Sequence, residues 1–180
     1  FSLYAGKKTA QVIEELSERF KIQDQKNFFN EIMNITNNIY SKDLMPVKGA
    51  RNFLENNSKK IFIGSNSIKE RILLGLKKTQ LDNFFSEDKV FSFDLVKNPK
   101  PYPDIYLKVI NTQCLNKNET IIIEDSAVGV QSGVAAGIKV IGFTAGKHWH
   151  QGRSKQDLID SKAFSLIDSY DDLTKKIEDL

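Results

Sequence analysis

One segment limits the possible folds of this chain more than any other. Thr120 to Ile123 form a short apolar run that leads directly into two neighbouring carboxylates, Glu124 and Asp125. A helical pattern over residues 128–136 follows. This order is typical of an open α/β sheet, in which ligands bind beyond the carboxyl ends of the strands. We therefore expect a buried strand that presents two acids at a ligand-binding edge.

The chain from residue 46 onward repeats this alternation of short apolar runs and amphipathic segments. Such alternation predicts an α/β fold, a Rossmann-like, mostly parallel sheet with helices on both faces. The predicted strands cover residues 60–63, 90–93, 120–123, 139–143 and 163–166, and the predicted helices cover 47–56, 68–77, 104–111, 128–136, 155–160 and the C-terminal segment.

Residues 1–45 contain no strand-like run and follow a helical pattern instead. Apolar residues recur at helical spacing within residues 9–20 and 28–39, and Met45-Pro46 breaks the pattern. We therefore predict a small α-helical domain over residues 1–45 and an α/β core over residues 46–180.

Composition excludes several classes of function. The net charge is only +3 and the lysines are scattered among acids, so no nucleic-acid partner is expected. No apolar run approaches the length of a membrane span, and no membrane partner is expected. A lone cysteine, Cys114, suits a reducing compartment, so we expect a cytoplasmic protein. The sequence gives no indication of the oligomeric state.

Two further strand ends carry polar residues that suit a phosphate. Gly64-Ser65-Asn66 follow an apolar run, and Ser65 Oγ with the next backbone N–H groups could hold a phosphoryl oxygen at a helix start. The alternative is a helix cap, in which Ser67 forms a capping box with Glu70.

Lys100 lies between two prolines, in the sequence Pro99-Lys100-Pro101-Tyr102-Pro103. Proline restricts its own backbone and that of the preceding residue, which delays the next helix until about Pro103. A stiff loop can aim one ammonium group at a phosphate and a nucleophile. The alternative is an ordinary solvated lysine.

Glu124 and Asp125 suit Mg²⁺, which prefers oxygen ligands and keeps several waters. Buried strands rarely end in two carboxylates unless a positive group compensates them. Gly129, Gly133 and Gly137 recur every four residues of the following helix, and we interpret them as a packing face. No Asp-x-Asp occurs in the chain, so the acidic site lacks the partner carboxylates that it is expected to need.

These three strand ends together resemble motifs II, III and IV of the haloacid dehalogenase (HAD) superfamily. The resemblance covers the whole chain and is closest to the subfamily of β-phosphoglucomutase and sugar-phosphate phosphatases, which carry an α-helical cap. It implies that Ser65 and the Asn66 backbone bind the phosphoryl group. It also implies that Lys100 steadies nucleophile and phosphate, and that Asp125, supported by Glu124, ligates Mg²⁺.

Motif I of that superfamily, with its nucleophilic aspartate, is missing from the sequence. The family places it on a central strand before the cap, so we expect that strand to precede Phe1 and the cap to be incomplete at its N-terminus. Without the strand, the sheet should have a gap with apolar edges. In the cap, Lys7 or Lys8 would contact the distal part of a phosphorylated ligand, although a solvated helix start is an equal alternative.

The sequence therefore predicts that the parent protein is a Mg²⁺-dependent phosphohydrolase. It would act on a small phosphorylated metabolite through an aspartyl-phosphate, and this chain would be an inactive fragment without the nucleophile. The alternatives are a β-phosphoglucomutase-like phosphosugar mutase and a catalytically dead phosphate-binding fragment. His148 and His150 leave a metal site open, but a loop over the core edge is the favoured interpretation.

Overall fold

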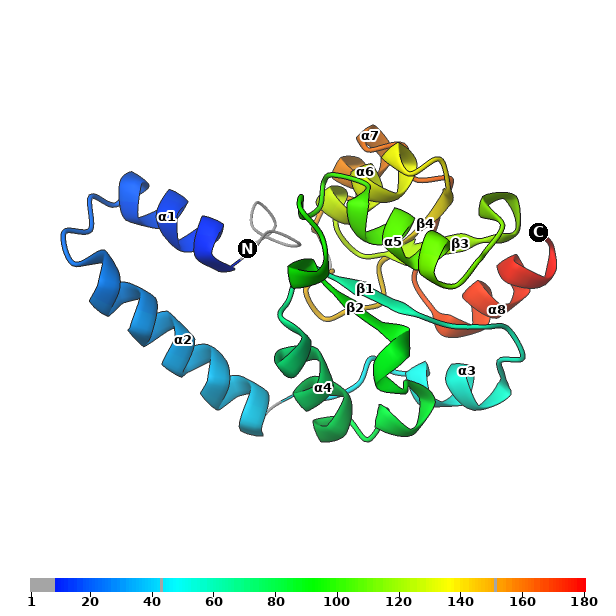
Figure 1. Ribbon diagram of the computed structural model, residues 1–180, viewed down its shortest axis with the longest axis horizontal. Helices are drawn as coiled ribbons and strands as arrows, with labels where there is room; N and C mark the ends of the chain where they lie inside the picture. The colour runs from blue at the N-terminus through cyan, green and yellow to red at the C-terminus, as the bar shows by residue number, and fades with distance from the viewer. Residues whose placement is uncertain (1–8, 43, 151) are drawn as a thin grey trace.

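A computed structural model describes residues 9–42, 44–150 and 152–180, and Figure 1 shows how their elements are arranged. No helix in these ranges combines the length and apolar character needed to cross a membrane. The helices are α1 (Thr9–Arg19), α2 (Gln25–Lys42), α3 (Ala50–Asn56), α4 (Lys69–Lys78), α5 (Asp104–Thr112), α6 (Ala127–Ala135), α7 (Gln156–Asp160) and α8 (Tyr170–Glu178). The strands are β1 (Ile63–Ser65), β2 (Val90–Ser92), β3 (Ile121–Glu124), β4 (Lys139–Phe143) and β5 (Ser165–Ile167).

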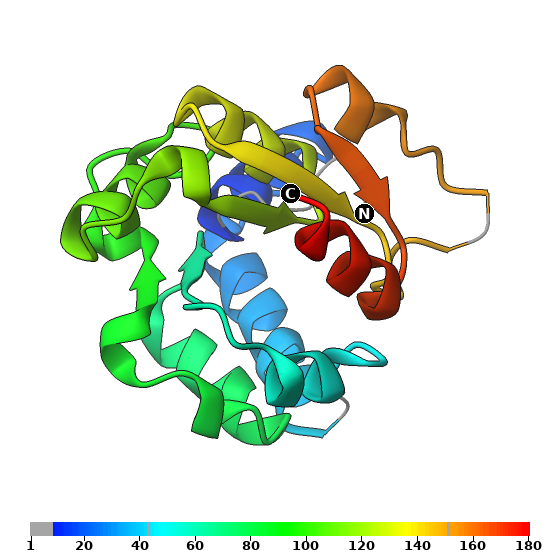
Figure 2. The same cartoon turned by 90° about the vertical axis from the view of Figure 1, so that its right-hand side faces the viewer.

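All strand pairs are parallel, which confirms the predicted α/β class. They form two groups, one of β1 and β2 and the other of β3, β4 and β5 in that order. Figure 2 shows these two groups of arrows apart from each other. Among the described residues, β1 pairs only with β2 and β3 pairs only with β4. The parallel sheet is therefore interrupted between β1 and β3, a gap of the kind expected from the sequence.

Two predicted strands begin at least two residues later in the structure than the apolar pattern suggests. Residues 60–63 were expected as a strand, but β1 begins at Ile63 and includes Gly64 and Ser65. β1 is this short because β2, its partner among the described residues, pairs with these three residues only. The pairing runs from Ile63 opposite Val90 to Ser65 opposite Ser92. β5 likewise begins at Ser165, where its pairing with β4 begins.

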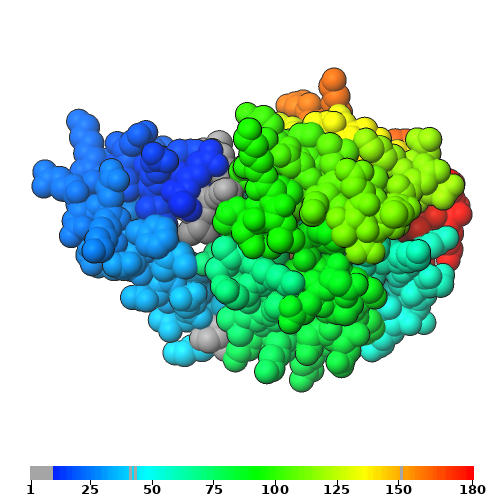
Figure 3. All heavy atoms as spheres, viewed as in Figure 1, coloured from blue at the N-terminus to red at the C-terminus, as the bar shows by residue number. Residues whose placement is uncertain are grey.

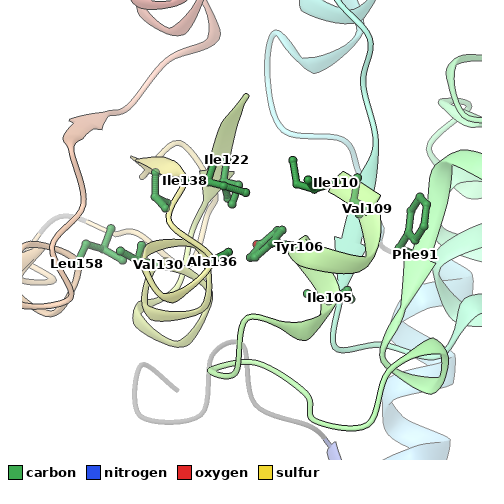
Figure 4. Packing of buried hydrophobic residues seen from close by; sticks show 11 residues of the cluster. Phe91, Ile105, Tyr106, Val109, Ile110, Ile122, Val130, Ala136, Ile138 and Leu158 are labelled. Carbon is green, nitrogen blue, oxygen red and sulfur yellow. The ribbon is translucent and has the colours of Figure 1, made fainter. Parts of the chain in front are cut away.

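The interior consists of two apolar clusters on opposite faces of the strands. Val140 of β4 belongs to one cluster and its neighbour Ile141 to the other, as the alternation of side chains along a strand requires. Figure 4 shows the larger cluster, in which helices α5 and α6 cover the strands. Helices α3 and α8 pack together, and residues of both contribute to the smaller cluster. Helices thus lie on both faces, as predicted.

Helices α1 and α2 pack against each other and extend away from the α/β part (Figures 1 and 3). They meet it where α2 lies beside α4. At that contact Arg71 Nη2 lies 3.5 Å from Met33 Sδ, and its guanidinium lies 6.0 Å from the centre of the Tyr40 ring. The division into a helical domain over residues 1–45 and a core over 46–180 stays a prediction.

Close packing of α6 on the strands predicts a sensitive position at Gly133. A Cβ atom there would lie 2.5 Å from Val140 Cγ2 and 2.9 Å from Ile122 Cδ1. Gly133→Ala should therefore lower the free energy of unfolding by about 1–3 kcal/mol, since overpacking displaces core side chains. Urea denaturation followed by circular dichroism measures this change.

Gly75→Ala in α4 is the matched control for that prediction. Its new Cβ would lie 3.5 Å from Leu44 Cδ2, an ordinary contact. Because alanine favours helix over glycine, this variant should gain up to about 1 kcal/mol. Equal effects of the two substitutions would contradict the packing assigned to Gly133.

Candidate active site

A cavity of about 490 Å³ lies between the ends of β1 and β3. Tyr170 and Phe143 contribute an apolar wall on one side. The sequence-predicted residues that line the cavity are Ser65, Asn66, Lys100, Glu124 and Asp125. The fold thus brings together all three strand ends that the sequence pointed to. Lys7 and Lys8, the predicted distal contacts, lie outside the described residues.

Lys100 is fixed at both its backbone and its side chain. Asn66 Oδ1 accepts a hydrogen bond of 2.9 Å from Lys100 N, and Asn66 Nδ2 donates one of 3.2 Å to Lys100 O. The ammonium Nζ donates to the carbonyl of Gly64 at 2.8 Å. Lys100 is 7% exposed, so the alternative of a solvated lysine is wrong. The Asn66 side chain holds the lysine loop, in addition to any role of its backbone.

Glu124 is the main partner of Lys100. The two side chains form a buried ion pair, and Glu124 also accepts hydrogen bonds from the hydroxyls of Tyr106 and Ser126. Ser126 in turn caps α6, because its Oγ accepts from the N–H of Gly129 at 3.1 Å. Three donors thus surround this carboxylate. The positive group that a buried acidic strand end requires is Lys100.

Gly129 provides the space that Glu124 occupies. A Cβ atom at this position would lie 1.9 Å from Glu124 Oε2. The glycine repeat in α6 therefore serves two purposes. Gly133 permits close packing on the strands, as interpreted from the sequence, whereas Gly129 admits a carboxylate of the site.

Tyr106 is a site residue that the sequence analysis missed. It is buried on α5 and donates its hydroxyl to Glu124, and the Lys100 ammonium lies 4.7 Å from the centre of its ring. Burial, followed by the charge of Glu124, raises the pKa of Tyr106 well above its usual value, so the phenol keeps its proton and acts as a donor. Tyr106 lies two residues after Asp104 on an apolar helix face, so nothing in the sequence around it indicated a polar role.

Asp125 points away from this network. Its side chain is 57% exposed, and His148 Nε2 lies 3.4 Å from its Oδ2. Partial removal from water, followed by the charge of Glu124, raises the pKa of Asp125, while His148 and Lys100 oppose the shift. An accessible carboxylate with insufficient positive compensation suits a hard divalent cation. No group of three or more His, Cys, Asp or Glu side chains that could hold a metal ion occurs in the described ranges, so Asp125 accounts for one ligand position.

Ser65 ends β1 with its hydroxyl at the cavity. Ser65 Oγ accepts a hydrogen bond of 3.1 Å from the N–H of Ser67. The alternative of a capping box formed by Ser67 and Glu70 is wrong, because α4 begins at Lys69 with Ile68 in the cap position and no side-chain cap. The N–H of Ser67 is drawn to Ser65, which places this turn at the cavity before the helix starts.

The parallel strands and the cavity place this chain in the class of α/β enzymes whose site lies at the carboxyl ends of the strands. The sequence profile of the haloacid dehalogenase-like hydrolases matches residues 1–143, and the chain belongs to that family. The resemblance inferred from the sequence motifs is thereby confirmed.

Similar proteins agree with this assignment. A phosphorylated carbohydrates phosphatase of Thermotoga maritima is 28% identical over 130 residues, 70% of this chain and 59% of that relative. The chain therefore spans less than two thirds of the relative. A conserved haloacid dehalogenase-like protein of unknown function from Agrobacterium tumefaciens has a TM-score of 0.84 at 25% identity, over 97% of this chain and 79% of that chain. A β-phosphoglucomutase-like protein of Thermotoga maritima shares the fold, with a TM-score of 0.76 at 24% identity over 94% and 78%.

The buried ion pair predicts a large effect of Lys100→Met on stability. Removing the ammonium leaves the Glu124 carboxylate buried without its counter-charge, which should lower the free energy of unfolding by about 3–5 kcal/mol. The double variant Lys100→Met/Glu124→Gln should regain part of this loss, because the amide is neutral and can still accept from Tyr106. Chemical denaturation of four proteins, the unsubstituted protein, Lys100→Met, Glu124→Gln and the double variant, measures the coupling.

Lys108→Met is the matched control for Lys100→Met. Lys108 lies on α5 and is exposed, so its replacement should change stability by less than about 0.5 kcal/mol. A loss at Lys100 no larger than that at Lys108 would contradict the described pair.

The raised pKa of Asp125 predicts a pH-dependent effect of Asp125→Asn. A raised carboxyl pKa means that the ionised form destabilises the fold, so stability falls as pH rises through the folded-state pKa. In cation-free buffer the variant should therefore melt at a higher temperature than the unsubstituted protein at pH 7. The difference should fade as pH falls below the ordinary value of 3.8. Asp94→Asn, at an exposed position outside the cavity, serves as the control.

Proposed function

We propose that this chain contributes the phosphate-binding and cation-binding half of a Mg²⁺-dependent phosphatase that acts on a small phosphorylated metabolite. The observation that carries the proposal is the convergence of Ser65, Lys100 and Asp125 on one cavity. A hydroxyl, a fixed ammonium and an accessible carboxylate are the groups that phosphoryl transfer uses for positioning and charge stabilisation. The similar carbohydrate phosphatase supports a phosphorylated sugar as the substrate.

In this proposal each residue has a role that follows from its position. Ser65 binds a phosphoryl oxygen, and Lys100, held by Asn66 and Glu124, offsets the negative charge of phosphate and nucleophile. Asp125 holds Mg²⁺, and bound Mg²⁺ would supply charge neutralisation of the phosphate oxygens. Glu124 supports the cation site indirectly, since its carboxylate is engaged by Lys100, Tyr106 and Ser126.

The nucleophile is the part that this sequence does not supply, since it contains no Asp-x-Asp. We place it on an additional parallel strand between β1 and β3, where the sheet is interrupted. Ile123 supports this placement, because it is 40% exposed although it lies within a β-strand of the core sheet. The carboxyl end of such a strand would reach the cavity that Ser65 and Asp125 line, as an aspartyl-phosphate mechanism requires. Without that strand, we expect the chain alone to be inactive.

Helices α1 and α2 would form the cap, which selects the substrate by its contacts above the cavity. The single cysteine, Cys114, is free and exposed, which suits a reducing compartment such as the cytoplasm.

The decisive test is phosphate release by the complete product of the gene. With Mg²⁺, the protein should hydrolyse an aryl phosphate, and a panel of sugar phosphates, nucleotides and pyrophosphate should identify its preferred substrate. Asp125→Asn should lower kcat/KM by orders of magnitude. Full activity of that variant would refute the assigned role of Asp125, and Asp94→Asn controls for the substitution itself.

Two alternatives give different results in the same experiment. A phosphosugar mutase would return the phosphate on the sugar, so little inorganic phosphate would appear. A catalytically dead phosphate-binding fragment would show no turnover with any substrate. Comparing the mass of the purified protein with its reading frame would show whether an Asp-x-Asp strand is encoded upstream.

A further inference from the structure

The loop between β4 and α7 crosses the acidic strand end and contacts Asp125 at two points. His148 Nε2 lies 3.4 Å from Asp125 Oδ2, and Trp149 Nε1 donates a hydrogen bond of 3.2 Å to the backbone carbonyl of Asp125. The side chain and the main chain of one residue are thus both held by consecutive residues of this loop. The favoured interpretation of the histidines from the sequence, a loop over the core edge, describes this segment.

Arg153 holds the loop in place from the other side. Its guanidinium lies 3.5 Å from the centre of the Trp149 ring, and its Nη1 donates to the carbonyl of His148 at 3.2 Å. Arg153 Nη2 also lies 3.5 Å from Asp157 Oδ2 at the start of α7, and the Arg153 side chain is only 6% exposed. An arginine stacked on an indole in this way stabilises the ring orientation.

Gly146 adds a steric argument for the same arrangement. It lines the cavity, and a Cβ atom there would lie 2.8 Å from the His148 ring. The turn therefore admits His148 beside Asp125 only because residue 146 has no side chain. The contacts run in sequence from α7 through Arg153 and Trp149 to Asp125.

We propose that His148 and Trp149 are positioning residues that hold Asp125 in the orientation in which it receives a divalent cation. The inference rests on the proposed cation site at Asp125. Trp149 fixes the backbone of the ligand residue and His148 fixes its carboxylate, which reduces the conformational freedom that cation binding would otherwise remove. Hydrogen bonds to the residues that bind a metal commonly change its affinity by about 10- to 100-fold.

Trp149 also makes the proposal directly measurable, because it is the only tryptophan in the chain. Its indole N–H bonds to the residue that would bind the cation, so its fluorescence should change when Mg²⁺ is added. In Asp125→Asn this change should disappear. The unsubstituted protein therefore reports occupancy of the proposed site without any catalytic assay.

The test measures the Mg²⁺ affinity of the unsubstituted intact protein and of four variants by calorimetric titration. Trp149→Phe keeps an aromatic ring but removes the N–H donor, and His148→Ala removes the imidazole. Each should weaken Mg²⁺ binding about tenfold or more. His150→Ala is the matched control, since it lies two residues on in the same loop and is exposed, and its affinity should not change. Asp125→Asn defines complete loss of the site.

The outcomes separate this inference from the proposed function. If Asp125→Asn abolishes binding while Trp149→Phe and His148→Ala bind Mg²⁺ like the unsubstituted protein, the positioning role is wrong and the cation site stands. A lower melting temperature with unchanged affinity would have the same meaning. If Asp125→Asn binds Mg²⁺ normally, or the unsubstituted protein does not bind it, both proposals fail. Should Trp149→Phe not fold, His148→Ala alone decides the question.

Discussion

The buried ion pair between Lys100 and Glu124 is the interaction on which the site depends. Lys100 comes from the loop before α5, and Glu124 ends β3. The same ammonium also reaches the carbonyl of Gly64 in β1. One lysine thus joins the two groups of strands where no backbone ladder joins them among the described residues. The position of Ser65 at the end of β1 relative to Glu124 at the end of β3 follows from this contact.

Glu124 and Asp125 are adjacent in sequence but differ in environment. Successive side chains at a strand end point in opposite directions, and here Glu124 turns inward to Lys100 while Asp125 faces His148 and the cavity. The sequence predicted that Asp125 ligates the cation directly and that Glu124 supports it. The structure gives Glu124 a buried counter-charge and leaves Asp125 accessible. This difference arises from packing, because Gly129 leaves the space that the Glu124 carboxylate occupies.

Much of the fold could be predicted from the local sequence pattern. The features that could not be predicted depend on contacts between segments that are distant in the sequence. β4 matches its predicted bounds of residues 139–143, because an apolar run with partners on both sides forms a ladder along its whole length. The start of β1 was predicted too early, since a strand with one partner ends where the partner ends. Ser65 and Asp125 were singled out because they lie at strand ends, and Lys100 because the prolines on both sides stiffen its loop. Tyr106 was missed because no spacing rule relates a buried helix residue to an acid eighteen positions later.

Helix α5 has a consequence for cooperativity. It packs on β1 and β2 through one part of its surface and on α6 through another, and Tyr106 reaches across to Glu124. An uninterrupted sheet transmits unfolding from strand to strand through backbone hydrogen bonds, whereas no such bonds join β1 and β3 in the described part of the chain. Amide exchange in the two strand groups should therefore be linked through side chains, those of Lys100 and of α5, so opening of α5 would weaken the link and leave units of unequal protection.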